Sequence, residues 1–239
     1  MNTILLLTIT SIVVCFIIIL IENHLLSYTN KIYKDVVNKD LCNTIINKSN
    51  EYTYETYKEP VDSKKVYQID VYSSIEDNTP IQNKVLWKYV KDIYQNSISP
   101  ILKKTCLKYK LLTKLKIDWV FIRKYNTFER EDLSIHTDEN IITVNVLLSD
   151  TSKYSGGEFY IFDRKTSQKY MNYYDNVLQE NETKKKEFIQ SFETLPIVDM
   201  NQGDIIIYSG MKHLHGVLPM NSGTRYIISY FLSSNIFSY

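Results

Sequence analysis

The segment ITVNVLLSD, residues 142–150, decides the fold, because its β-branched side chains alternate with polar ones at a period of two. That period is typical of a β-strand with one buried face. Four further segments carry the same signal: IDWVFIRKY (117–125), EFYIFD (158–163), DIIIYS (204–209) and TRYIISYFL (224–232). No helix separates most successive strands, so we expect antiparallel pairing. The prediction is a mainly β domain with bracing helices, a two-sheet jelly roll or double-stranded β-helix.

Shorter signals flank these strands. VYQIDVY (66–72) is typical of a strand, and residues 81–97 carry apolar side chains at i, i+3 and i+4 spacings. That spacing predicts an amphipathic helix ended by Pro100, followed by a second helix from 101 to about 112. Residues 164–195 form a charged insertion that exceeds ordinary loop lengths. The insertion is either a solvated excursion with a short helix or a lid over a binding site.

The composition excludes several classes of protein. With 239 residues and a mass of 28.2 kDa, the chain has room for one sizeable domain and an appendage. A formal net charge of +1 argues against nucleic-acid binding, and 44% hydrophobic residues exclude a globally disordered chain. The three cysteines, Cys15, Cys42 and Cys106, are too far apart in sequence for a zinc site. Cys42 and Cys106 could form a disulfide, but we favour free thiols.

The N-terminus contains an uncharged apolar run at residues 4–21. A bilayer is spanned by ~20 such residues. No Lys or Arg precedes the run and no small-residue cleavage site follows it, which favours an uncleaved membrane anchor over a signal peptide. We predict a transmembrane anchor at 1–25, a stalk or irregular lead-in at 26–65, and the main domain at 66–239.

The side of the membrane stays open at this point. Lys31, Lys34 and Lys39 follow the apolar run and favour a cytosolic domain. Two glycosylation sequons, at Asn47 and Asn181, favour a luminal one.

A candidate metal site begins at His136 and Asp138. On an extended backbone, side chains at i and i+2 point to the same side, so an imidazole and a carboxylate can bind one cation together. A second histidine from a neighbouring strand would complete a two-histidine, one-carboxylate triad, in which Fe(II) is the usual metal. His213 and His215 are the two candidates downstream.

Arg225 is the second candidate functional residue. It lies ten residues after His215, across a turn and on the following strand, which places its guanidinium beside the metal pocket. A buried guanidinium needs an anionic partner. That partner is either a dicarboxylate bound to the metal at its other end or a structural aspartate. Trp119 and Tyr208, in apolar strands, are expected in the core.

These segments, in their order and spacing, resemble the iron(II)- and 2-oxoglutarate-dependent dioxygenases, and within them the prolyl 4-hydroxylase and lysyl hydroxylase catalytic domains. The matching motifs are HTD (136–138), TVNVLLSD (143–150), YSGGEFYIF (154–162), GDIIIYSG (203–210), HGVLP (215–219) and SGTRYIISYF (222–231). The resemblance covers about residues 117–232. It implies iron ligands at His136, Asp138 and His215, in preference to His213, and it places the distal carboxylate of 2-oxoglutarate at Arg225.

Further contacts follow from the same resemblance. Tyr125 corresponds to a tyrosine that contacts the distal carboxylate, and Thr143 and Asn145 are expected to line the cosubstrate pocket. No catalytic residue beyond the metal ligands is expected. Collagen-type prolyl hydroxylases usually carry lysine where this chain has Arg225, a departure that concerns the substrate and not the cosubstrate.

The activity implied is hydroxylation of a C–H bond in a peptidyl proline or lysine. O2 and 2-oxoglutarate would be consumed, succinate and CO2 released, and L-ascorbate would keep the iron reduced. The expected partners are a peptide or protein substrate and a membrane, in a single-pass protein of the endoplasmic reticulum if the catalytic domain is luminal. The alternatives are a hydroxylase of a small molecule or lipid, and a non-catalytic β-sandwich binding module.

Overall fold

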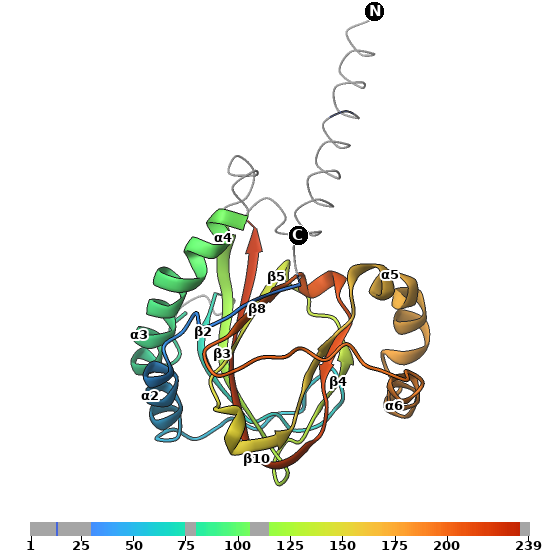
Figure 1. The fold of residues 1–239 in the computed structure, drawn as a ribbon, viewed down its shortest axis with the longest axis horizontal. Helices are drawn as coiled ribbons and strands as arrows, with labels where there is room; N and C mark the ends of the chain where they lie inside the picture. Colours follow the sequence, from blue (N-terminus) through green and yellow to red (C-terminus); the bar gives the residue numbers. More distant parts are fainter. Residues whose placement is uncertain (1–12, 14–29, 75–79, 106–114, 235–239) are drawn as a thin grey trace, which may run out of the picture.

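Two antiparallel β-sheets face each other at the centre of the protein (Figure 1). The computed structural model describes residue 13 and residues 30–74, 80–105 and 115–234. The larger sheet has the strand order β1-β8-β5-β10-β3-β2, with β6 paired to β10, and the smaller has the order β4-β9-β7. The strands are β1 (Lys31–Tyr33), β2 (Gln68–Ser73), β3 (Leu115–Asn126), β4 (Leu133–His136), β5 (Ile142–Leu147), β6 (Tyr154–Gly156), β7 (Phe159–Ile161), β8 (Ile205–Tyr208), β9 (His215–Val217) and β10 (Met220–Ser234). The predicted antiparallel β domain is confirmed.

The long pair β3 and β10 explains the period of two in the sequence. Their register runs from Thr224 opposite Asn126 to Ser234 opposite Leu115, with one bulge near Phe231. Alternate residues on each strand face the interior between the two sheets. The intervening residues, such as Ile122 and Ile228, point the other way into an apolar core. One sheet thus supplies both a functional face and a packing face.

Three helices cover the outer face of the larger sheet: α2 (Lys39–Ser49), α3 (Lys84–Ile93) and α4 (Ser99–Thr105) (Figure 1). Helix α3 buries Leu86, Val90 and Ile93 at i, i+4 and i+7, as the sequence predicted. The expectation that Pro100 ends the helix is wrong. A π-helical turn over Tyr94–Ile98 leads directly into α4, and Pro100 lies in the first turn of that helix, where no backbone N–H is required.

Within the lead-in expected at residues 26–65, the structure describes residues 30–65 and places two regular elements there, β1 and α2. Strand β1 adds to the edge of the larger sheet beside β8, and α2 contributes the buried Cys42 and Ile45 to the core. The chain then crosses towards the smaller sheet as the cyan coil of Figure 1. We call residues 57–65 of this coil the strap. Most strap residues are polar, and their charged side chains pair with residues that lie far away in the sequence.

The insertion at 164–195 folds onto the outer face of the smaller sheet (Figure 1). It consists of α5 (Arg164–Tyr173), a π-helical turn (Tyr174–Leu178) and α6 (Glu182–Gln190). Buried side chains from these elements, including Leu178 and Phe188, pack against Ile135 and Tyr160 of the sheet. The insertion is therefore a packed helical layer, and none of its residues lines the central cavity.

The predicted anchor at 1–25 lies outside the described residues, apart from position 13. Among the residues that are described, no helix has both the length and the apolar character needed to cross a membrane. Cys106 and the end of the second predicted helix also lie outside them. Cys42 is a buried free thiol within the described part of the chain.

Candidate metal centre

Three side chains converge between the two sheets: His136, Asp138 and His215. The histidines are Cα partners across the β4–β9 pair, and Asp138 follows His136 by two residues. Oδ1 of Asp138 lies 3.4 Å from Nε2 of each histidine. One ligand atom from each residue lies within 4.8 Å of the others. This set of two imidazoles and one carboxylate is suited to a single divalent transition-metal ion and leaves further coordination positions open.

Backbone carbonyls fix both imidazoles. Nδ1 of His136 lies 2.8 Å from the carbonyl oxygen of Ser134, and Nδ1 of His215 lies 2.9 Å from that of His213. Each Nδ1–H therefore donates to a carbonyl, which leaves the Nε2 lone pair directed towards Asp138 and a shared cation. This tautomer is the one that metal binding requires.

The carboxylate of Asp138 is oriented by Thr143. The Thr143 hydroxyl donates to Oδ2 of Asp138 at 2.5 Å, which turns Oδ1 towards the histidines. Asn140 donates to Thr143 Oγ1 at 3.0 Å. The sequence placed Thr143 in the lining of the cosubstrate pocket. Thr143 shares the inward face of the larger sheet with its Cα partner Phe231, but its contact is with Asp138 and it is not among the residues that line the cavity.

The charge state of the site favours a cation. Burial alone would raise the pKa of Asp138, but His215 and His136 outweigh it and hold that pKa well below its usual range. Burial, together with the neighbouring His215, lowers the pKa of His136. At neutral pH the site therefore offers an ionised carboxylate beside a neutral imidazole, the protonation states that bind metal.

A cavity of about 630 Å³ separates the two sheets and contains the triad in its wall. Its inner lining alternates along the strands of the larger sheet, with Trp119, Phe121, Arg123 and Tyr125 from β3 and Arg225, Ile227, Ser229 and Phe231 from β10. Leu133, Phe159 and Val217 line it from the smaller sheet. The triad, on the smaller-sheet side, faces a mostly apolar pocket with a few polar groups, as ligand sites typically do.

Arg225 lies at one end of this cavity. It is the Cα partner of Tyr125 across β10 and β3, and its guanidinium carbon lies 5.7 Å from the centre of the Tyr125 ring. The nearby Arg225 lowers the pKa of the Tyr154 hydroxyl, although burial of that hydroxyl outweighs it and raises the pKa overall. Nη1 of Arg225 is buried and has no hydrogen-bond partner among the described residues. A buried cationic donor without a partner is costly, so this end of the cavity is suited to an anionic group.

The structure brings together most of the residues singled out from the sequence. Asn145 lines the cavity and donates to the Tyr208 hydroxyl at 3.1 Å, while it accepts from Ser229. His213 lies outside the cavity lining, with Nδ1 directed to the Ser209 carbonyl. Arg225 pairs with neither an aspartate nor a glutamate among the described residues, contrary to the structural ion pair that the sequence left open.

Tyr208 and Trp119, which the sequence assigned to the core, both line the cavity, and Tyr208 also belongs to a buried core cluster as expected. The Tyr208 hydroxyl lies 3.2 Å from Nε2 of His215. Trp119 lines the cavity, and its indole nitrogen donates to Asp70. The period of two within β3 could have indicated the inward direction of Trp119, because Trp119 shares a face with Tyr125, which had been assigned to the site.

The fold is that of the 2-oxoglutarate- and Fe(II)-dependent oxygenases. A member of the 2OG-Fe(II) oxygenase family from Burkholderia pseudomallei superposes with a TM-score of 0.57 at 12% identity, over 89% of each chain. HygX from Streptomyces hygroscopicus, solved with nickel and 2-oxoglutarate, gives 0.55 at 11% identity, over 88% of this chain and 85% of its own. A prolyl hydroxylase from Trichoplax adhaerens, in complex with a hypoxia-inducible-factor peptide, gives 0.52 at 11%, over 89% and 87%. No family model and no curated protein matches the sequence.

Proposed function

We propose that the protein is an Fe(II)- and 2-oxoglutarate-dependent dioxygenase that hydroxylates a C–H bond. One observation carries the proposal: a buried metal-ligand triad shares a cavity with an arginine whose Nη1 lacks a partner. The triad is suited to a metal ion, and the arginine is suited to a carboxylate. A dicarboxylate that chelates the metal ion at one end would place its other carboxylate at the arginine. The oxygenase fold supports the same function.

Each residue has a defined task in this proposal. His136, Asp138 and His215 would hold Fe(II), with Thr143 keeping the Asp138 carboxylate in place. Arg225 would bind the distal carboxylate of 2-oxoglutarate. Iron and 2-oxoglutarate, when bound, would supply an oxidative decarboxylation in which O2 gives one oxygen atom to succinate and the other to the hydroxylated product, with release of CO2.

The remaining wall of the cavity excludes water and orients the cosubstrate. Tyr125 packs below the guanidinium of Arg225, and Asn145 and Tyr208 present polar groups between the arginine and the triad. Burial raises the pKa of Tyr208 well above its usual range, so its hydroxyl stays protonated and can donate a hydrogen bond.

A peptidyl proline is the substrate we favour, with peptidyl lysine next. The Trichoplax prolyl hydroxylase of similar fold is bound to a peptide, which supports this choice. The small-molecule alternative has its own support, because HygX has also been solved with hygromycin B bound.

The proposal includes ascorbate as the reductant that keeps the iron in its ferrous state. It also includes an N-terminal membrane anchor with a luminal catalytic domain. Protease protection in microsomes tests the anchor and its orientation.

The test is substrate-coupled turnover of 2-oxoglutarate. Protein purified without oxygen, loaded with Fe(II) and given ascorbate, should release succinate and add one oxygen to proline- or lysine-containing peptides, detected by mass spectrometry. Asp138→Ala and His215→Ala should abolish both signals. Undiminished turnover by either variant would refute the proposal. Oxidation of small molecules alone would support the small-molecule alternative.

A further inference from the structure

The strap forms part of the cavity wall. Tyr57, Glu59, Pro60 and Val61 all line the cavity, and Tyr57 and Pro60 are among its exposed lining residues. Exposed lining residues mark the mouth, where a substrate enters, whereas Arg225 is buried. The strap therefore faces the part of the cavity that the proposed cosubstrate would leave open.

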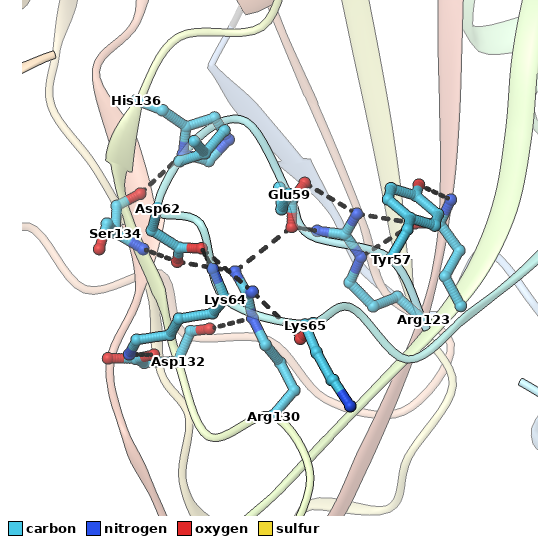
Figure 2. Close-up of polar contacts among 12 residues, drawn as sticks. Tyr57, Glu59, Asp62, Lys64, Lys65, Arg123, Arg130, Asp132, Ser134 and His136 are labelled. Atoms are coloured by element: carbon cyan, nitrogen blue, oxygen red, sulfur yellow. Dashed lines mark hydrogen bonds and ion pairs between the residues drawn. The ribbon is translucent and has the colours of Figure 1, made fainter. Parts of the chain in front are cut away.

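Buried ion pairs attach the strap to the larger sheet. Glu59 binds Arg123 of β3 through both carboxylate oxygens, at 3.0 Å each. Its Oε2 also lies 3.3 Å from Arg130. Both arginine side chains are at most 4% exposed, so these contacts are shielded from solvent (Figure 2).

A second set of contacts attaches the strap to the smaller sheet. Asp62 is fully buried and accepts from Arg130 at 2.8 Å, and the backbone N–H of Ser134 in β4 approaches the same carboxylate. Lys64 pairs with Asp132, just before β4 (Figure 2). Ser134 is the residue whose carbonyl holds His136, so the strap and the proposed metal-binding strand share one support.

Helix α6 of the insertion reaches the strap from the other side. Lys185 is 1% exposed although it stands in the run Lys184-Lys185-Lys186, and its Nζ donates to the Val61 carbonyl of the strap. The same Nζ pairs with Glu182 at 2.7 Å, and Glu182 accepts from the Ser134 hydroxyl at 2.5 Å. Burying an ammonium group is costly, so its two acceptors must compensate.

We propose that Lys185 is a positioning residue that sets the place of the strap, and thereby makes the insertion a determinant of substrate selection at the proposed active site. The insertion contributes no residue to the cavity, but it supports the strap through Val61 and β4 through Ser134. The insertion therefore affects substrate selection by setting the position of the strap, and with it the width of the cavity mouth. This inference rests on the proposed function only for the identity of the ligand.

Hydrogen exchange of the full chain, without metal or cosubstrate, tests the structural step. The strap amides are protected by internal bonds, including Ser63 N–H to the Glu59 carbonyl at 2.8 Å. Lys185→Met removes a charged hydrogen bond, so exchange of strap peptides should accelerate by about tenfold or more, with β3 and β10 unchanged. Lys186→Met, an exposed neighbour on the same helix, should leave the strap as in the unchanged protein, and Lys185→Arg should restore much of its protection.

Two exchange results would overturn the proposed role of Lys185. Unchanged strap exchange in a folded Lys185→Met protein would overturn the proposal, as would equal acceleration in Lys186→Met. If Lys185→Met does not fold, Glu182→Gln, which weakens the support of Lys185 but keeps its bond to Val61, should give a smaller acceleration confined to the strap. No acceleration in that variant would also overturn the proposal.

Binding and turnover measurements separate this inference from the proposed function. Affinities for Ni(II) and for 2-oxoglutarate should change by less than about twofold in Lys185→Met, while KM for an accepted peptide rises and kcat changes less. An unchanged KM beside accelerated exchange would refute the role in substrate selection. Failure of the unchanged protein to bind Ni(II) and 2-oxoglutarate would refute the proposed function and leave the exchange result standing.

Discussion

The functional geometry depends on residues that hold other residues in place. Ser134, His213 and Thr143 fix the two imidazoles and the carboxylate of the triad. Such partners set ligand orientation and basicity, and their loss typically weakens metal binding by about 10–100-fold. The triad is therefore already arranged for a cation by its hydrogen bonds alone.

Thr143→Val tests this arrangement. The substitution keeps the shape but removes the hydroxyl that donates to Asp138, so Ni(II) affinity should fall by about 10–100-fold, measured by calorimetry. Thr151→Val, at an exposed position, is the matched control and should leave affinity unchanged. Equal affinity in both variants would contradict the role of Thr143.

Arg225→Gln tests the other end of the cavity. Loss of a charged donor aimed at a carboxylate removes about 1.5–3 kcal/mol, so the Kd of 2-oxoglutarate should rise by about 10–100-fold in the Ni(II)-loaded protein. Ni(II) affinity in the same variant should be unchanged and serves as the internal control. A Kd within twofold of the starting value would show that Arg225 does not bind the cosubstrate.

At the residue scale the sequence predicted the ionisable members of the site, because HTD (136–138), His215 and Arg225 carry recognisable chemistry and spacing. It did not predict that Trp119 and Tyr208 line the cavity or that Thr143 holds the Asp138 carboxylate. An apolar strand context does not distinguish a core position from the wall of a cavity. Which hydroxyl supports Asp138 depends on the local path of the chain between β4 and β5.

At the scale of elements, the strap is attached by buried charges. Asp62 and Arg130 form a pair in which neither side chain is more than 1% exposed. Removal of one partner from such a pair leaves an uncompensated buried charge.

Asp62→Asn should therefore lower the free energy of unfolding by about 3 kcal/mol, measured by urea denaturation. Glu51→Gln is the comparison, since the Lys48–Glu51 pair is exposed and contributes at most about 1 kcal/mol. Similar losses in both variants would show that the buried pair does not stabilise the strap.

The elements missed from the sequence share one physical cause. Strand β1 has three residues, too few for a period to be visible, and it is defined by pairing with β8 far along the chain. The strap has no apolar period at all, because its partners Arg123, Arg130 and Lys185 lie 64 to 124 residues away. By contrast, α3 and the long strands carry their own periodic signals and were predicted.

At the scale of the whole molecule, many ionisable groups are buried in their neutral form. Burial raises the pKa of the Cys42 thiol from its ordinary value of 9.0 to about 12, and that of the Tyr174 hydroxyl from 10.0 to about 12. Burial likewise raises the pKa of Tyr230 well above its usual range. Above the ordinary values, unfolding releases protons from these groups, so stability is lost as pH rises towards 12.

The urea midpoint should accordingly fall between about pH 8 and about pH 10.5, with part of the loss suppressed in Tyr174→Phe. Fluorescence or circular dichroism follows the transition at both pH values. A midpoint that stays constant or rises over this interval would contradict the account of these buried groups.

We propose that His136, Asp138 and His215 hold one metal ion to which 2-oxoglutarate binds, with Arg225 at its far end. The most direct measurement is an oxygen-free calorimetric titration of the full chain, first with Ni(II) and then with 2-oxoglutarate. We predict one Ni(II) per chain, 2-oxoglutarate binding only after the metal, and loss of both steps in Asp138→Ala. Stoichiometric Ni(II) and 2-oxoglutarate binding by a folded Asp138→Ala protein, with undiminished affinity, would show that Asp138 is not a metal ligand.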